Sequence, residues 1–261
     1  MNNVKNPRDI REMIAAGNWK SPTTGLAPAY AQANLVILDR QYAFDFLLFC
    51  TRNSKPCPII EVMEPGRYEP SFTAPGADIR KDLPLYRIWK NGEFESETPD
   101  ISSRFTDDMV SFLLGCSFSF EGALLSAGIP IRNIEQGKNV SMYVTNRQCN
   151  PAGIFSSPLV VSMRPIPERQ VIRAVQITGR YVSVHGAPVH IGDPAALGIR
   201  DLSKPDFGDP VEIQPGDIPI FWACGVTSSL AALSARLEIC ITHAPGHMFI
   251  TDILNETMAA I

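Results

Sequence analysis

The stretch SMYVTN, residues 141–146, marks the point at which the sequence changes from helical to β-rich patterns. Downstream of it, short runs rich in β-branched and aromatic residues alternate with turns that contain Gly or Pro, which is typical of strands. Because helical patterns come first and strands follow, the order predicts a mixed α/β fold of the α+β kind. The runs are PLVVSMRP (158–165), IRAVQITGRY (172–181), PVHIGD (188–193), VEIQPGDIPIFWACG (211–225) and ICITHAPGHMFITD (239–252).

Upstream of residue 141 the patterns predict helices joined by a few strands. Asn6 and Pro7 suit the start of a helix and Gly17 suits its end, and Asn91-Gly92 suits the type I′ turn of a hairpin. Residues 17–38 read as a long ordered loop. The further expected elements are helices over 40–51, 107–114 and 119–128, a buried strand over 58–63, and one late helix over 228–237.

Composition and charge exclude several classes of protein. The chain has 261 residues, 45% of them hydrophobic, and a net charge of −4, so we expect no general attraction to nucleic acid or to anionic membranes. The longest apolar run, residues 42–50, is far shorter than the roughly 20 residues of a membrane span. The N-terminus lacks the apolar core of a signal peptide. We therefore expect a soluble cytoplasmic protein that acts on a small molecule and can self-associate.

No familiar cofactor signature is present. The six cysteines form no CxxC pair, so the sequence predicts neither a zinc ribbon nor a thioredoxin motif. No GxGxxG follows a strand and no GxxxxGK[ST] occurs, which excludes both phosphate-binding fingerprints. No cofactor follows from these patterns, and a divalent metal such as Mn or Mg remains open.

All four histidines lie in two short loops of similar make-up. His185 and His190 belong to HGAPVHIGDP, and His243 and His247 belong to ITHAPGHMFITD, with Gly and Pro between each pair. Pro245 and Gly246 argue against a helical HxxxH metal motif. Three readings stay open: hydrogen bonds that order the turns, metal ligation together with Asp193 or Asp252, and acid–base or binding work. We expect the two loops to converge on one pocket.

Three further sites offer groups that hold a small acid. The turn before the helix at 119–128 carries Cys116, Ser117 and Ser119, and its free amides suit a carboxylate; the alternative is that Ser119 only caps the helix and Glu121 adds a favourable first-turn charge. Arg164 ends an apolar strand, so it pairs with an acid or meets an anionic substrate. Cys224 precedes a predicted helix start, where it is either activated by the helix dipole or simply buried.

These residues lie within nine sequence blocks by which the chain is identified as a member of the D-glutamate cyclase family, whose bacterial members are labelled hydro-lyases. The resemblance runs from about residue 8 to 253, and a local departure is Phe105 where tryptophan is expected. The blocks are AYAQANLVIL, DFLLFCTRN, PCPIIEV, DIRKDLPLYRIW, GCSFSFEGAL, PLVVSMRP, HGAPVHIGDP, FWACGVT and ITHAPGHMFITD.

The resemblance implies a fold and an activity. It implies two subdomains, a three-layer α/β/α part and a smaller two-layer α/β sandwich. We place the boundary so that residues 1–140 form a helix-rich α/β part and 141–261 a β-rich part with the histidine loops, unless one part is inserted in the other. The implied reaction converts D-glutamate to 5-oxo-D-proline with loss of water. The alternatives are a lyase or hydratase for another small carboxylic acid, a non-catalytic small-acid binder, and a metal-dependent hydrolase.

Roles for the candidate residues follow from the chemistry of cyclisation, which needs a base near the amine, an acid near the γ-carboxyl group and an anchor for the α-carboxylate. We assign no metal ligands. The expected catalytic residues are His243 and His247, supported by His185 and His190, with Glu121 as an orienting acid. The expected substrate-binding residues are Arg164, Ser117, Ser119, Cys116, Asp193 and Cys224.

Overall fold

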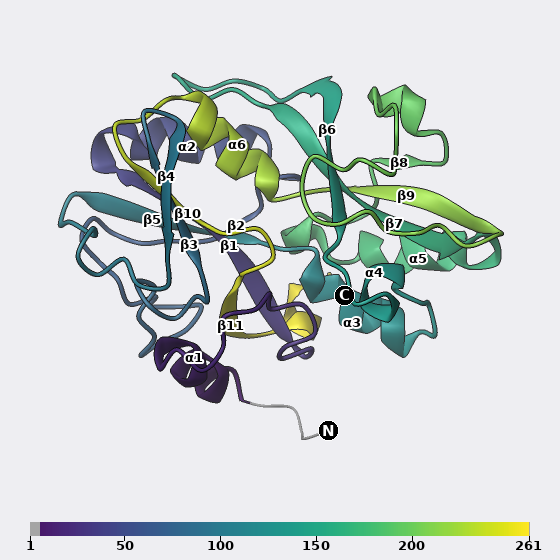
Figure 1. The fold of residues 1–261 in the computed structure, drawn as a ribbon, viewed down its shortest axis with the longest axis horizontal. Coiled ribbons are helices and arrows are strands. Elements are labelled where there is room, and N and C mark those ends of the chain that lie inside the picture. Colours follow the sequence, from purple (N-terminus) through teal and green to yellow (C-terminus); the bar gives the residue numbers. More distant parts are fainter. Residues whose placement is uncertain (1–5, 261) are drawn as a thin grey trace.

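Two antiparallel sheets lie side by side in the computed structural model, which describes residues 6–260 (Figure 1). The seven-stranded sheet has the order β2-β5-β1-β10-β3-β4, with β11 also paired to β1, and the four-stranded sheet has the order β6-β7-β9-β8. The strands are β1 (Tyr30–Asp39), β2 (Ile59–Val62), β3 (Tyr86–Lys90), β4 (Glu93–Thr98), β5 (Met109–Gly115), β6 (Ser141–Gln148), β7 (Pro158–Pro167), β8 (His190–Ile191), β9 (Asp217–Ala223), β10 (Cys240–His243) and β11 (Phe249–Leu254). The helices are α1 (Pro7–Ala15), α2 (Arg40–Arg52), α3 (Phe118–Ser126), α4 (Arg132–Glu135), α5 (Val171–Gly179) and α6 (Val226–Ser234).

Strand β1 is the central strand of the larger sheet, where the sequence predicted a loop. It pairs with β5 along one edge and with β10 and β11 along the other, and residues 31–38 are all buried. A strand covered on both faces shows a continuous apolar run instead of an alternating one, so its periodicity carries little signal. The loop prediction for residues 30–38 was therefore wrong.

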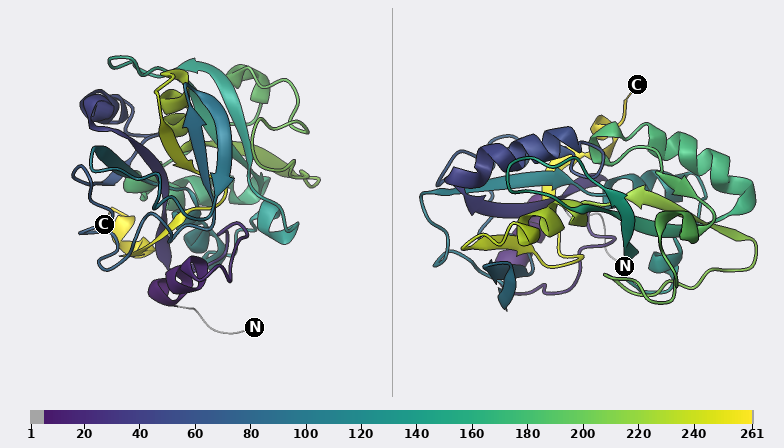
Figure 2. Two further views of the ribbon diagram at one scale, coloured as in Figure 1. Left: turned by 60° about the vertical axis from the view of Figure 1, so that its left-hand side comes forward. Right: turned by 90° about the horizontal axis from the view of Figure 1, so that it is seen from above.

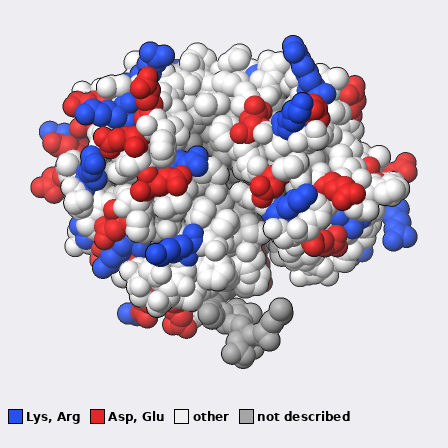
Figure 3. Space-filling view, viewed as in Figure 1, with Lys and Arg blue, Asp and Glu red and all other residues white. Residues whose placement is uncertain are grey.

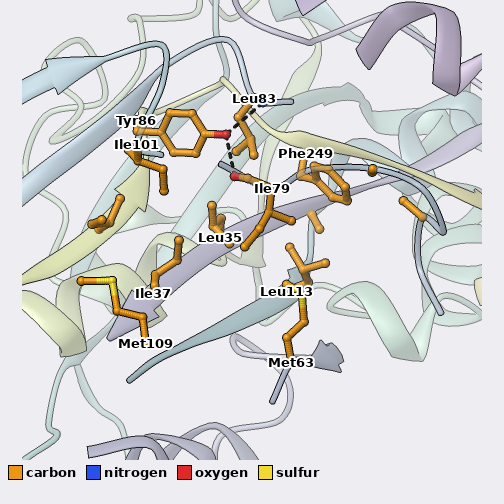
Figure 4. Packing of buried hydrophobic residues seen from close by; sticks show 14 of the residues in the cluster. Leu35, Ile37, Met63, Ile79, Leu83, Tyr86, Ile101, Met109, Leu113 and Phe249 are labelled. Atoms are coloured by element: carbon orange, nitrogen blue, oxygen red, sulfur yellow. Dashed lines mark hydrogen bonds between the residues drawn. The ribbon is translucent and has the colours of Figure 1, made fainter. Parts of the chain in front are cut away.

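Helices α2 and α6 cover one face of the seven-stranded sheet, as Figures 1 and 2 show. The Asp39 side chain caps α2 by accepting a hydrogen bond from the amide of Gln41. The largely irregular segments 63–85 and 99–108 cover the opposite face. There the Tyr86 hydroxyl donates to the carbonyl of Ile79 at 2.6 Å and accepts from the amide of Leu83, which fixes segment 63–85 over the sheet (Figure 4).

Helices α3 and α5 pack on one face of the four-stranded sheet around Trp222, whose indole N–H donates to the hydroxyl of Thr178 at 3.1 Å. The segment that carries Leu197 and Ile199 covers part of the other face. The mixed α/β class is thus confirmed, with two antiparallel sheets. Strand β6 begins at Ser141, and β10 and β11 return to the larger sheet after the smaller one is complete; the division into domains stays a prediction.

Two further expected elements were wrong. Residues 109–115 form strand β5 instead of a helix, and residues 171–179 form helix α5 instead of a strand. Every residue of β5 is buried, so its sequence is compatible with a helix or with a strand. Pairing with the two neighbouring strands, β1 and β2, decides that it forms a strand. The hairpin at Asn91-Gly92 is confirmed, since both residues have positive φ, 53° and 79°.

The face of the molecule drawn in Figure 3 shows no large area of one charge. On the face drawn in Figure 3, acidic and basic side chains are interspersed over both parts of the molecule. Among residues 6–260, no helix combines the length and the apolar character that a membrane crossing requires.

Candidate active site

A narrow cleft opens where the two sheets meet, and its walls hold five of the residues that the sequence singled out. Both sheets contribute to the lining, which includes Asn34 from β1, His243 from β10, and the ends of β5 and β9. The cavity volume of about 20 Å³ corresponds to on the order of one water molecule. The residues that matter for chemistry in this inter-sheet cleft are Asn34, Cys116, Ser117, His185, Cys224 and His243.

Two strand-to-helix turns of the same design face the inter-sheet cleft. After β5 the chain passes through Cys116 and Ser117 into α3, and after β9 it passes through Cys224 and Gly225 into α6. Neither helix has a side-chain cap. The first amide of each helix instead donates to the cysteine sulfur of its own turn, and the next two amides donate to carbonyl oxygens of that turn. The positive ends of two helix dipoles meet at the cleft.

His185 is held as a neutral imidazole with its lone pair on Nε2. Its backbone is left-handed at φ 88°, and its Nδ1 lies 2.8 Å from the carbonyl oxygen of Lys55. A carbonyl only accepts, so Nδ1 carries the proton. Burial lowers the pKa of His185 to about 4, although hydrogen bonding to Lys55 opposes the shift. Near pH 7 the ring is uncharged, and Nε2 can accept a proton.

His243 has the opposite tautomer. His243 Nδ1 lies 3.2 Å from the amide nitrogen of Leu35 and 3.4 Å from its carbonyl oxygen, and the shorter contact favours an Nδ1 that accepts, with the ring proton on Nε2. Burial lowers the pKa of His243 to about 4 as well. Within residues 6–260, Nε2 has no hydrogen-bond partner, and the ring lines both the inter-sheet cleft and a neighbouring hollow beside Arg87. His243 thus offers a donor where His185 offers an acceptor.

Arg164 lies behind the wall of the inter-sheet cleft, fully buried against Glu121. Its Nη2 lies 2.6 Å and its Nε 3.0 Å from Glu121 Oε1, and Nη2 also donates to Ser117 Oγ at 2.9 Å. Phe120 and Trp222 flank the guanidinium. Burial raises the pKa of Glu121, and the Arg164 charge opposes that shift. Because Ser117 Oγ accepts from Arg164, its own proton is free to point elsewhere.

The other expected site residues lie outside the lining. His190 Nε2 contacts the carbonyl of Asp193 at 2.7 Å, and the Asp193 carboxylate accepts from an amide within its own turn. His247 contacts two carbonyl oxygens with its two ring nitrogens. Ser119 accepts from the amide of Gln32 and joins α3 to β1. One histidine from each loop therefore reaches the cleft, and the roles of the others stay predictions.

Sequence reasoning missed Asn34 because it lay within the presumed loop. Both hydrogen bonds that Asn34 makes within residues 6–260 are donated by Nδ2, to the carbonyls of Leu114 and Gly115, which leaves Oδ1 free to accept. The sequence signal that could have identified Asn34 is its position as the one amide side chain within the otherwise apolar run ANLVIL. Asn139 also lines the inter-sheet cleft and was missed, since nothing in its local sequence marks it.

Gly225 holds open the space that Asn34 occupies. A Cβ added there would lie 2.2 Å from Asn34 Nδ2, while the glycine φ of −61° is allowed for any residue. We expect Gly225→Ala to lower turnover at least tenfold with little change in the thermal midpoint, because the side chain of Asn34 must rotate away. Gly179→Ala, whose Cβ meets nothing closer than 3.8 Å, is the matched control. Equal activity in both variants would remove Asn34 from the site.

No group of three or more His, Cys, Asp or Glu side chains in the described part of the chain is arranged to hold a metal ion. All six cysteines are free thiols. Two of them, Cys116 and Cys224, belong to the inter-sheet cleft, and burial raises their pKa values to about 12 and about 11.

Comparison with known proteins gives the family. The family model for D-glutamate cyclase matches residues 110–252. A protein of Syntrophobacter fumaroxidans is 69% identical over the whole of both chains, and YcsI of Bacillus subtilis is 56% identical over 98% of this chain and 99% of its own; both carry the name "Putative hydro-lyase". A relative in Stutzerimonas stutzeri with the same name is 60% identical over 98% and 96%. The match covers the cleft turns and both histidine loops, so the chain belongs to the D-glutamate cyclase family of hydro-lyases.

Proposed function

We propose that the inter-sheet cleft converts D-glutamate to 5-oxo-D-proline with loss of water. The observation that carries the proposal is the pair of buried neutral imidazoles with opposite tautomers, His185 as acceptor and His243 as donor, in one cleft. The family supports the choice of substrate, since it is the D-glutamate cyclase family.

Cyclisation joins the α-nitrogen of glutamate to its own γ-carboxyl carbon. The α-ammonium group first gives a proton to His185 Nε2, and the free amine then attacks the γ-carbon. The oxygen that becomes negative is stabilised by His243 Nε2–H and by the hydroxyl of Ser117. The two protons lost from nitrogen leave with one carboxyl oxygen as water, so the overall reaction takes up no proton. Holding both ends of one molecule close supplies much of the rate.

Carboxylate binding is assigned to the two helix N-termini. The positive dipole ends of α3 and α6 both meet at the cleft, which favours binding of the two carboxylates of glutamate there. Arg164 acts through Ser117, which it holds by a hydrogen bond, and through Glu121, which keeps the guanidinium in place. Arg164 is thus a positioning residue in this proposal and not the direct anchor that the sequence suggested.

Substrate entry requires movement of side chains. The present cavity holds on the order of one water, so a five-carbon amino acid enters only when the lining opens. The hollow next to it shares His243 and Val226 and adds Arg87 and Trp89, which makes it the natural route of entry. A cytoplasmic location suits the six free thiols, because oxidising compartments favour disulfides.

The test is incubation of purified protein with D-glutamate, L-glutamate or 5-oxo-D-proline, followed by proton NMR, with Mn²⁺ or with a chelator. We expect D-glutamate and 5-oxo-D-proline to interconvert faster than L-glutamate reacts, and the chelator arm decides whether a metal contributes. Folded protein that leaves every sample unchanged would overturn the proposal. Turnover of another small acid would then indicate a different hydro-lyase reaction, and thermal stabilisation by glutamate without turnover would indicate a binding protein.

The pH dependence of turnover gives a second test. His185 acts as a base only while neutral, and burial lowers its pKa from 6.5 to about 4. We expect kcat/KM to stay level from pH 7 to about pH 5 and to fall as the pH approaches 4. An exposed histidine would instead cause a fall near its usual pKa of about 6.5. A fall centred near pH 6.5, in protein that remains folded, would contradict a buried base.

Protein stability must be followed in the same series. The unfolded chain binds protons at these two histidines below about pH 6.5, while the folded chain binds them only near pH 4. The free energy of unfolding therefore falls as the pH is lowered from about 6.5 to about 4. Above about pH 6.5 the contribution of these two histidines to stability is fully present. Urea midpoints at each pH separate this loss from the loss of turnover.

A further inference from the structure

Cys116 and Cys224 occupy equivalent positions on the two sides of the inter-sheet cleft. Each follows the last residue of a strand, one in each sheet, and lies two residues before the first residue of a helix. Each sulfur accepts a hydrogen bond from the amide two residues ahead, that of Phe118 or of Val226. Cyclisation uses neither thiol, so it does not explain why both strand-to-helix turns carry a cysteine at the same position.

The two thiols lie together in space. Both belong to one packed cluster with Phe118, Val140 and Met248, and both line the same cleft. Burial raises the pKa of Cys116, and the nearby Cys224 thiol adds to the rise. A thiol so desolvated is a strong base once it has lost its proton, and the amide at each sulfur stabilises that thiolate.

Independent groups in the cleft point to a ligand between the thiols. Asn34 and His243 are 3% and 5% exposed, and each has a polar atom, Oδ1 and Nε2, without a partner within residues 6–260. Both atoms are therefore able to hydrogen-bond a ligand in the cleft. No Asp, Glu, Lys or Arg lines the cleft, so the proton-carrying side chains there are two thiols and two imidazoles.

We propose that Cys116 and Cys224 form a base–acid pair that exchanges and inverts the α-hydrogen of an acidic α-amino acid bound in the inter-sheet cleft. The pair reacts with one sulfur as a thiolate, whose proton has left to solvent, and the other as a thiol. The resulting thiolate takes the α-proton, so a C–H bond breaks and an S–H bond forms, and the electron pair moves into the α-carboxylate. The opposite thiol then gives its proton to the other face of the carbon. No oxidant or reductant is needed.

The inference rests on the proposed function only in placing an amino acid in this cleft, and it does not require cyclisation. The helix N-termini suit it equally well, because charge that develops on the α-carboxylate during proton removal is stabilised by the positive ends of the two helix dipoles. Two thiols carried by different sheets suit this chemistry, since a single base reaches only one face of the carbon.

The experiment follows deuterium entry at the α-carbon by proton NMR, with D-glutamate and separately L-glutamate in D₂O, and measures inversion by chiral chromatography. The wild-type chain, Cys116→Ala, Cys224→Ala and the buried control Cys240→Ala are compared, together with the milder Cys→Ser variants. Cys240 is buried in the seven-stranded sheet outside the cleft. The same spectra report 5-oxoproline, so cyclisation is measured in every tube.

We expect wild type and Cys240→Ala to incorporate deuterium into both enantiomers. Cys116→Ala and Cys224→Ala should each lower the rate of exchange at least about a hundredfold with one enantiomer of glutamate and leave exchange with the other enantiomer intact. The enantiomer affected should differ between the two variants. A purely structural defect would lower both enantiomers alike. Cyclisation without any α-exchange in wild type overturns this proposal and leaves the proposed function standing, whereas exchange without cyclisation does the reverse. If folded wild-type protein shows neither exchange nor cyclisation, both proposals are overturned.

Discussion

Replacing His185 with asparagine is expected to lower turnover of D-glutamate by about 10² to 10⁴, the usual range for a lost acid–base group. Asparagine keeps the two structural features of this position. Its amide can still donate to the carbonyl of Lys55, and asparagine tolerates the left-handed backbone that His185 adopts. The variant therefore removes the free Nε2 lone pair and little else. Turnover and thermal midpoint are measured on the same preparation.

His190 and His247 supply the matched controls. Both have ring nitrogens that contact carbonyl oxygens outside the inter-sheet cleft. Glutamine at either position is expected to change turnover by less than about threefold, although the sequence alone placed His247 among the catalytic residues. A His185→Asn protein with unchanged turnover, or a His247 variant with a hundredfold loss, would move the chemistry out of the cleft.

The second large effect is expected on stability, from the buried pair Arg164 and Glu121. Replacing Arg164 with methionine leaves the Glu121 carboxylate without its partner in a fully buried site and removes a donor from Ser117. Breaking such a pair on one side costs about 3–5 kcal/mol. We expect the free energy of unfolding, measured by urea denaturation at pH 7, to fall by that amount, and turnover of the remaining folded protein to fall as well.

A double variant separates the two contributions. Arg164→Met with Glu121→Leu replaces both charges by apolar groups, which is often close to neutral for a buried pair. We expect it to recover most of the lost stability but not the turnover, because Ser117 still lacks its partner. Recovery of both would show that Arg164 only stabilises the fold. Additive losses in the double variant would show that the two side chains do not interact.

The sequence predicted local elements well where capping or turn residues mark them. The first helix, with Asn6 before it and Pro7 at its first position, and the Asn91-Gly92 hairpin are both confirmed. Errors fell where burial on both faces removes periodicity, as in β1 and β5. There the pairing of strands distant in sequence decides the structure, and one chain read alone does not contain it.

The candidate site was predictable in parts. Unusual residue types in Gly- and Pro-rich loops pointed to His185 and His243, and the turns before two helices pointed to Cys116, Ser117 and Cys224. The convergence of these residues depends on contact between two sheets. Which histidine of each pair faces inward could not be read from the sequence either, because the answer depends on backbone partners such as Lys55 and Leu35.

The most direct measurement is an NMR titration of protein labelled with ¹⁵N in its four histidines. Before ligand is added, the spectra should show His185 protonated at Nδ1 and His243 protonated at Nε2. On addition of D-glutamate, the signals of His185 and His243 should shift, while those of His190 and His247 stay in place. Shifts confined to His190 and His247, or no shift under conditions of active turnover, would contradict a catalytic cleft between the two sheets.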